Sequence, residues 1–263
     1  MLAQIVLFDG FDPLDVVAPY EVLFAGGALA EGALTVELVS AEGAREVPSG
    51  TGTLTLKATT RLDPARADLV VVPGAAGRFT DTVDAGDRAE AGADAGAGGG
   101  GGADIGGGPD TGAGADAGAG GCQDLSIFDH LQGAVETELA PLLREAHARP
   151  GLTMATVCGG SLLMGMAGLL VGRHATTHSL GCDGLTRAGA IAVNARVVDD
   201  GDLVSGGGVT SGLDLALYLL EREVGSGVAH VVEQLFEYER RGTVWRAPTA
   251  RDASTVPASA DRI

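Results

Sequence analysis

Short apolar runs alternate with amphipathic segments along this chain. Continuous apolar runs at Leu2–Phe8, Ala67–Val72 and Leu152–Val157 are typical of strands buried on both faces, and Leu34–Ser40 is a further strand candidate. Helical spacing predicts helices that start after Asp12 and that cover residues 125–149, 161–170, 213–224 and 228–241. The alternation predicts one α/β domain whose mostly parallel sheet is covered by helices on both faces.

Weaker signals lie between these elements. Val47–Gly52 combines proline, serine and glycine and predicts a turn, while Thr53–Lys57 alternates like a half-exposed strand. Arg173–Thr177 is a short extended segment. Ala192–Val198 and Asp202–Ser205 flank a polar Asp-Asp-Gly sequence, so this pair predicts a hairpin.

Residues 84–122 differ from the rest of the chain because glycine, alanine and aspartate dominate and no hydrophobic period is visible. This composition cannot bury enough apolar surface to offset the entropy of ordering, so we expect a disordered insert. A phosphate-binding loop is excluded because no lysine follows the glycines. We therefore expect a single domain over residues 1–246, interrupted by this insert, and a flexible tail over residues 247–263.

The overall charge limits the partners that the protein can bind. A formal net charge of -18 disfavours nucleic acid and anionic membranes as partners. No apolar window reaches the roughly 18 residues of a membrane span, and Met1 leads directly into a strand without a basic leader. Three cysteines without paired spacing fit a reducing compartment, so a cytoplasmic location is expected.

The sequence Thr156–Ser161 carries the strongest chemical signal. An apolar strand delivers Cys158 into Gly159 and Gly160, and a helix begins at once, which predicts a nucleophile elbow. A sulfur at a helix N-terminus feels the partial positive charge of free N–H groups, so we expect a thiolate. The alternative is a buried cysteine that acts only as a small apolar residue. The two glycines and the helix start favour the nucleophile.

Other candidates follow strands of the same predicted sheet, whose carboxyl ends collect ligands. Gly74 and Ala75 could direct backbone N–H groups at a developing negative charge, or they could form an ordinary tight turn. Asp15 could complement the dipole of its own helix. It could instead point at Cys158, so that the two groups titrate as a coupled pair and the carboxyl delivers a proton.

The remaining histidines and cysteines carry weaker signals. His174 or His178 could serve as a base for the thiol, but the residues between them favour an extended segment, so we expect no metal site. No motif surrounds Cys122 or Cys182, and we expect both to be structural.

Taken together, several motifs resemble the ThiJ/PfpI superfamily, a class I glutamine amidotransferase-like group. The segments that carry the resemblance to the superfamily are Phe8–Phe11, Leu14–Val16, Pro19–Val22, Val71–Gly74 and Val157–Ser161. Three further segments, Ala167–Arg173, Ala175–His178 and Gly206–Asp214, resemble the isonitrile hydratase-like branch. The resemblance covers most of the chain apart from residues 84–122 and the tail.

The resemblance implies a flavodoxin-like three-layer sandwich with a mostly parallel sheet, a homodimer, a small-molecule substrate and no cofactor. It implies a hydro-lyase in which Cys158 attacks an isonitrile carbon to give a thioimidate, and water then releases an N-substituted formamide. Asp15 would be the acid, Gly74, Ala75 and Gly159 would line the site, and His178 would lie near the thiol. Isonitrile hydratases commonly carry threonine where this chain has Gly159.

Two other functions remain open from the sequence. The chain could be a stand-alone ligand-sensing domain, since relatives of this fold form the N-terminal half of transcription activators. Only about two dozen residues follow Arg241, too few for a helix-turn-helix module. The chain could also be redox-responsive, with Cys158 oxidised in place of attacking a substrate.

Overall fold

A computed structural model describes residues 1–78 and 125–248 of the chain. The insert predicted at residues 84–122 and nearly all of the predicted tail lie outside the described residues. The predicted single domain over residues 1–246 stays a prediction. In the described part of the chain, no helix is long and apolar enough to cross a bilayer.

The predicted parallel sheet is confirmed. Its eight strands run in the order β12-β10-β11-β7-β6-β1-β2-β5, and every neighbouring pair is parallel except the hairpin of β10 and β11. The strands in chain order are β1 (Leu2–Leu7), β2 (Thr35–Ser40), β5 (Thr60–Arg61), β6 (Leu69–Val72), β7 (Thr153–Val157), β10 (Val197–Asp199), β11 (Leu203–Gly206) and β12 (Trp245–Arg246). The side chains of β6 are entirely buried, as expected for a strand covered on both faces.

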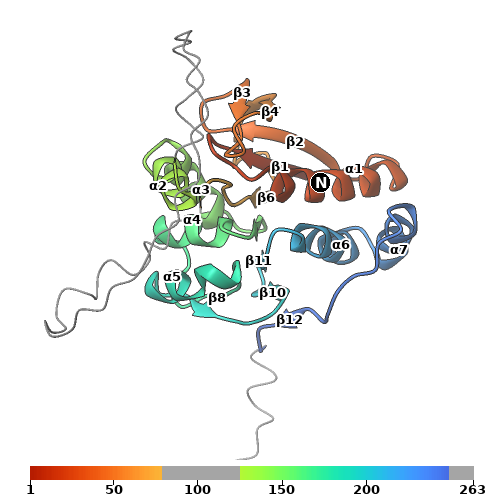
Figure 1. Ribbon diagram of the computed structural model, residues 1–263. Helices are drawn as coiled ribbons and strands as arrows, with labels where there is room; N and C mark the ends of the chain where they lie inside the picture. Colours follow the sequence, from red (N-terminus) through yellow and green to blue (C-terminus); the bar gives the residue numbers. More distant parts are fainter. Residues whose placement is uncertain (79–124, 249–263) are drawn as a thin grey trace, which may run out of the picture.

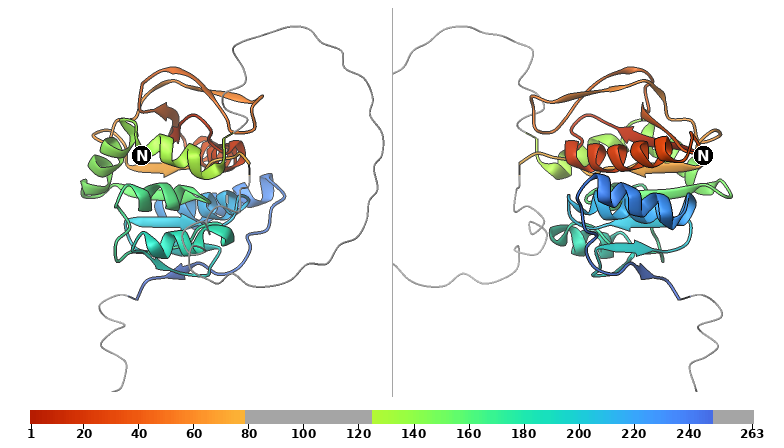
Figure 2. Two further views of the ribbon diagram at one scale, coloured as in Figure 1. Left: turned by 60° about the vertical axis from the view of Figure 1, so that its left-hand side comes forward. Right: turned by 90° about the vertical axis from the view of Figure 1, so that its right-hand side faces the viewer.

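Helices cover both faces of this sheet. The helices are α1 (Pro13–Leu29), α2 (Ile127–Val135), α3 (Leu139–Ala148), α4 (Gly160–Met166), α5 (Cys182–Arg187), α6 (Ser211–Glu223) and α7 (Ser226–Leu235). Figures 1 and 2 show α1, α6 and α7 packed together on one side of the sheet and α2, α4 and α5 on the other. The arrangement is the expected three-layer α/β fold.

Two short sheets lie beside the main one. β3 (Arg45–Pro48) and β4 (Thr55–Ala58) form an antiparallel hairpin, and β8 (His174–Ala175) pairs with β9 (Ile191–Ala192) in parallel. The predicted turn at Val47–Gly52 therefore begins two residues too early, because Val47 is a fully buried strand residue. The predicted first strand of the hairpin, Ala192–Val198, is likewise too long, since β10 begins only at Val197 and Ala192 belongs to β9.

Helix ends differ from the predictions in three places. The helical spacing over residues 125–149 corresponds to two helices, α2 and α3, separated at Glu136–Glu138. The elbow helix ends at Met166, and Gly168 follows with a positive φ of 78° that ends a helix favourably. Helix α7 stops at Leu235, six residues short of the prediction, and Glu237 adopts a left-handed φ of 49°.

Three adjacent strands bring the candidate residues together. β7, β6 and β1 are neighbours and all run parallel, so their carboxyl ends lie at one edge of the sheet. The segments that leave this edge are Phe8–Asp12, which leads into α1, then Pro73–Gly77, and the turn at Cys158. This confirms that the fold gathers the predicted segments at one place.

Candidate active site

Cys158 occupies the sharp turn between β7 and α4. Its φ of 54° lies in the left-handed region, which is uncommon for a residue with a side chain and costs conformational energy. Its N–H donates to the Gly206 carbonyl at 3.0 Å, which ties the turn to the neighbouring strand β11. Gly160 permits the turn, since a Cβ there would lie 2.1 Å from the Val72 carbonyl oxygen. The geometry is that of the expected nucleophile elbow.

Asp15 points into the site from the first turn of α1. Asp12 caps this helix by accepting the Leu14 N–H at 2.9 Å, which leaves Asp15 free to turn inward. The Asp15 carboxyl is fully buried, and its Oδ2 accepts the Gly74 N–H at 2.9 Å. Asp15 and Cys158 each shift the pKa of the other, which places the thiol beside this carboxyl, whose Oδ1 is buried without a hydrogen-bond partner among the described residues. Of the two alternatives that the sequence leaves open, the geometry therefore matches the pair with Cys158.

Burial dominates the electrostatics of this pair. Desolvation raises the pKa of Asp15 well above its ordinary value, while the hydrogen bond from Gly74 and the Cys158 thiol lower it in part. Desolvation and the Asp15 charge also raise the pKa of Cys158, and only the Gly159 N–H, which donates to the sulfur, opposes them. The expectation of a resting thiolate is therefore wrong, because burial to 8% exposure outweighs the helix N-terminus.

Backbone groups of two glycine-containing turns form the wall next to the sulfur. Gly74 and Gly159 approach each other so closely that a Cβ on Gly74 would lie 2.6 Å from the Gly159 nitrogen. The Ala75 nitrogen lies 3.8 Å from the position that a Gly159 Cβ would occupy. The Gly159 N–H donates to the sulfur, whereas the Gly74 N–H donates to Asp15 Oδ2. The prediction that Gly74 directs its N–H at a developing negative charge is therefore wrong, because that N–H holds the carboxyl.

The position of Gly159 has room for a side chain. A Cβ there would make ordinary contacts, at 3.4 Å from the Gly74 Cα and 3.5 Å from the Leu131 Cδ1. Its φ of −64° and ψ of −8° suit any L-residue. The backbone therefore does not require glycine at this position, and the threonine that the resemblance implies would have room there.

A set of buried hydroxyl groups holds the backbone of the elbow in place, and the sequence does not predict these contacts. The Thr177 hydroxyl donates to the Cys158 carbonyl at 2.7 Å. The Ser161 hydroxyl donates to the Thr176 carbonyl at 2.6 Å and lies 2.6 Å from the Thr156 hydroxyl. Isolated hydroxyl residues give no periodic signal, so only the fold reveals that these side chains meet.

His130 and Leu131 of α2 also border this region and were not predicted. The His130 ring packs against Gly10, where a Cβ would lie only 2.0 Å from the His130 Nδ1. This close approach and the φ of 94° explain why residue 10 is glycine. The His130 Nε2 is buried without a hydrogen-bond partner among the described residues. Leu131 faces Gly159, so α2 supplies an apolar boundary to the site.

The other predicted candidates make contacts with residues outside the pair. The His178 Nδ1 accepts the Leu180 N–H at 3.2 Å and caps a short 3₁₀ turn at Ser179–Gly181. Within residues 125–248, His178 makes no hydrogen bond to Cys158. The His174 Nδ1 lies 3.1 Å from Asp200, and its ring packs at a tilt of 40° against Trp245. Cys182 is a half-buried free thiol, and Cys122 lies outside the described residues.

The described residues contain no cluster of histidine, cysteine and carboxylate side chains that could hold a metal ion. For chemistry, the site offers the Cys158 thiol, the Asp15 carboxyl and the Gly159 N–H. A buried carboxyl beside a thiol can take up a proton and return it.

Sequence comparison matches residues 133–222 to the DJ-1/PfpI family, a range that includes Cys158 and Gly159. Isonitrile hydratase from Pseudomonas putida is 49% identical over 85 residues, which are 32% of this chain and 37% of that protein. The HTH-type transcriptional regulator GbdR from Pseudomonas aeruginosa is 32% identical over 113 residues, 42% of this chain and 30% of that protein. Each match therefore spans little more than a third of the relative or less.

Structural comparison covers more of the chain. A THiJ/PfpI family protein from Pseudomonas syringae matches with a TM-score of 0.62 at 23% identity, over 92% of this chain and 76% of that one. At this identity the likeness establishes the fold, while the sequence match establishes the relationship around the elbow. Over residues 133–222 the chain is therefore similar to the DJ-1/PfpI family, and its fold is like that of a THiJ/PfpI family protein.

Proposed function

We propose that this protein hydrates isonitriles to N-substituted formamides without a cofactor. The observation that carries the proposal is the buried pair of Cys158 and Asp15 at a strained elbow, where each group raises or lowers the pKa of the other. The 49% identity to an isonitrile hydratase over 85 residues supports this chemistry over other reactions of a cysteine nucleophile.

The first half of the reaction adds the thiol across the terminal isonitrile carbon. The carbon lone pair takes a proton from Asp15 while Cys158 sulfur forms a bond to the same carbon, and one carbon–nitrogen π bond is lost. The product is a thioimidate, in which the carbon bears the sulfur and the new hydrogen. The proton given by Asp15 is replaced by the proton that leaves the Cys158 thiol, so the pair ends with the same charge.

The second half releases the product with water. Water adds to the carbon–nitrogen double bond of the thioimidate, and the nitrogen takes up a proton. The carbon–sulfur bond then breaks as the hydroxyl loses its proton and becomes the formamide carbonyl, and the sulfur regains a proton. The net change is isonitrile plus water giving formamide. N–H groups of Gly159 and Ala75 would stabilise negative charge that develops on oxygen in this step.

The raised pKa values of both groups fit this reaction. Because each group disfavours a charge on the other, the pair keeps a proton available for transfer. A thiol that stays protonated also reacts slowly with oxidants, which act on the thiolate. This favours the enzyme over a redox-responsive protein, in which an exposed and acidic thiol would be expected.

The test is incubation of the purified protein with a simple alkyl isonitrile, with the formamide measured by proton NMR. We expect formamide from the wild type, and a loss of at least about 10⁴-fold with Cys158→Ala. Asp15→Asn should lower the rate by about 10²–10⁴-fold, as removal of a general acid does. Equal product from wild type and Cys158→Ala would reject the proposal.

A ligand-sensing function is the second candidate, favoured by the 32% identity to the regulator GbdR over 113 residues. A sensor would bind a small molecule at the same elbow and not convert it. Thermal stabilisation by an isonitrile or formamide that is recovered unchanged would favour the sensor, and turnover would favour the enzyme.

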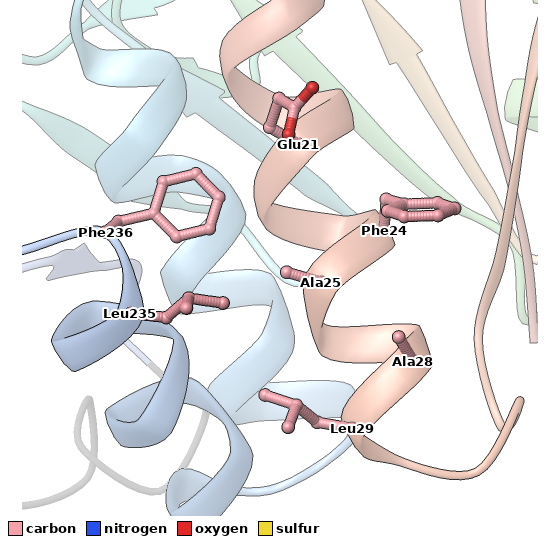
Figure 3. A pocket seen from close by; sticks show the side chains of 7 residues that line it. All are labelled: Glu21, Phe24, Ala25, Ala28, Leu29, Leu235 and Phe236. Carbon is pink, nitrogen blue, oxygen red and sulfur yellow. The ribbon is translucent and has the colours of Figure 1, made fainter.

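We also propose that the protein is a cytoplasmic homodimer. The family resemblance supports the dimer, and so does a groove of about 540 Å³ between α1 and the end of α7. Figure 3 shows its apolar side chains, with Phe24 57% exposed on α1 and Leu235 65% exposed on α7. Two copies packed face to face would remove this surface from water. Two free cysteines, Cys158 and Cys182, are consistent with a reducing compartment.

A further inference from the structure

The elbow carbonyl has a partner that neither the motif around Cys158 nor the proposed chemistry requires. Thr177 is 3% exposed, and its hydroxyl donates to the Cys158 carbonyl at 2.7 Å across 19 residues of sequence. This hydrogen bond is made to Cys158, whose φ of 54° is strained. A strained backbone persists only where its surroundings hold it, and this hydrogen bond is one such constraint.

The segment that carries Thr177 is itself anchored on two sides. The Thr176 N–H donates to the Ser205 hydroxyl on β11 at 2.9 Å, and the Thr176 carbonyl accepts the Ser161 hydroxyl on α4 at 2.6 Å. Both anchoring side chains are fully buried. Thr177 is therefore presented to the elbow by a rigid segment and not by a mobile loop.

We infer that Thr177 is a positioning residue that keeps the Cys158 backbone left-handed, so that the sulfur faces Asp15. Without the hydroxyl, the carbonyl of Cys158 would be buried without this donor. The turn would then lower its free energy by rotating toward ordinary φ values. Rotation about this backbone would move the sulfur away from the carboxyl. Thr177 acts through Cys158 and contacts no substrate.

The inference deepens the proposed function but is tested without it, through the coupling between Asp15 and Cys158. The probe is iodoacetamide at one mildly alkaline pH, with alkylation of the Cys158 peptide followed by mass spectrometry. The Asp15 charge raises the pKa of the thiol. Asp15→Asn alone should therefore be alkylated faster than the wild type, by roughly tenfold for each pKa unit that the charge contributes.

In a Thr177→Val background this acceleration should shrink to less than half, because the sulfur no longer faces the carboxyl. Thr177→Ser keeps the hydroxyl and should retain the full acceleration. Thr176→Val is the matched control, since the neighbouring threonine is also buried but uses its backbone groups in the contacts described above. If Thr177 only stabilised the fold, its substitution would lower the melting temperature. The ratio of the alkylation rates with and without Asp15→Asn would then stay the same.

Persistence of the full acceleration in folded Thr177→Val would overturn the inference. If Thr177→Val does not fold, the same ratio is measured in Thr177→Ala, and an unchanged ratio there overturns the inference as well. Loss of coupling in a protein that forms no formamide would uphold Thr177 as the positioning residue while rejecting the isonitrile reaction.

Discussion

Gly159 stands where the resemblance to isonitrile hydratases implies a threonine. The structure leaves room for a side chain there, between Gly74 and Leu131, with helical backbone angles. We expect Gly159→Thr to fold, with stability unchanged or raised by about 0.4–1 kcal/mol through a stiffer unfolded chain. The added hydroxyl should raise kcat/KM for an alkyl isonitrile several-fold.

Gly159→Val is the control for this substitution, because it has the shape of threonine without the hydroxyl. Valine should fold equally well and give no gain in turnover. Identical kinetics for the threonine and valine variants, measured by formamide formation, would contradict a role for the hydroxyl and leave only the volume of the side chain.

Asp15 should make the protein less stable as pH rises. Its pKa is raised in the folded state, so above the ordinary carboxyl range the unfolded chain releases this proton first and the free energy of unfolding falls. Each unit of raised pKa corresponds to about 1.4 kcal/mol. Asp15→Asn removes this penalty, so its melting temperature should match wild type at low pH and exceed it increasingly toward neutral pH. If the difference in melting temperature between Asp15→Asn and wild type stayed constant from acid to neutral pH, the raised pKa of Asp15 would be contradicted.

Among the helices, the contact of α6 with α1 and β7 sets how Asp15 and Cys158 approach each other. Gly212 lies at this junction, where a Cβ would be 3.2 Å from Pro19 Cδ and 3.5 Å from Val157 Cγ1. Pro19 follows Asp15 by one helical turn and Val157 precedes Cys158 directly. A side chain at Gly212 would therefore push apart the two elements that hold the pair.

Gly212→Ala tests this contact, and Gly227→Ala is a matched control. Both glycines are the second residue of their helices, but a Cβ at Gly227 meets nothing within 4 Å. Alanine at Gly227 should stabilise the protein by up to about 1 kcal/mol through helix propensity. Alanine at Gly212 should not stabilise it and should lower kcat. Equal stabilisation of both variants in denaturant unfolding would show that the junction has room to spare.

The sequence predicts the long elements well and the short ones poorly. Buried runs such as Leu69–Val72 identify strands, because a strand covered on both faces must be continuously apolar. Two-residue strands such as β5 and β12 carry too few residues for any period and were missed. The end of α7 was misplaced because amphipathic spacing continues past Leu235, although the chain turns at Glu237.

The site shows the same division. The elbow was predictable, because glycines after Cys158 mark a turn that a cysteine alone would not. The direction of the Asp15 side chain was not, because a carboxylate in the first helical turn fits the solvent side equally well. The protonation of the thiol was predicted wrongly, since burial depends on elements far away in sequence.

For the whole molecule, the exposed groove between α1 and α7 predicts self-association. Wild type should have the mass of a dimer by light scattering after size exclusion, and Phe24→Glu should have that of a monomer with an unchanged circular dichroism spectrum. Val171→Glu introduces the same charge at a residue that is 71% exposed outside the groove, and it should remain a dimer. A wild-type monomer, or a Phe24→Glu dimer, would contradict the proposal that this groove is the dimer interface.

The most direct measurement of the account as a whole is the mass of the peptide containing Cys158 after a reaction with an alkyl isonitrile is quenched. We predict an increase equal to the mass of the isonitrile, since the thiol adds across it without loss of atoms, and no increase in Cys158→Ser. An unmodified Cys158 throughout turnover, or one that gains only oxygen, would contradict the assignment of this sulfur as the nucleophile.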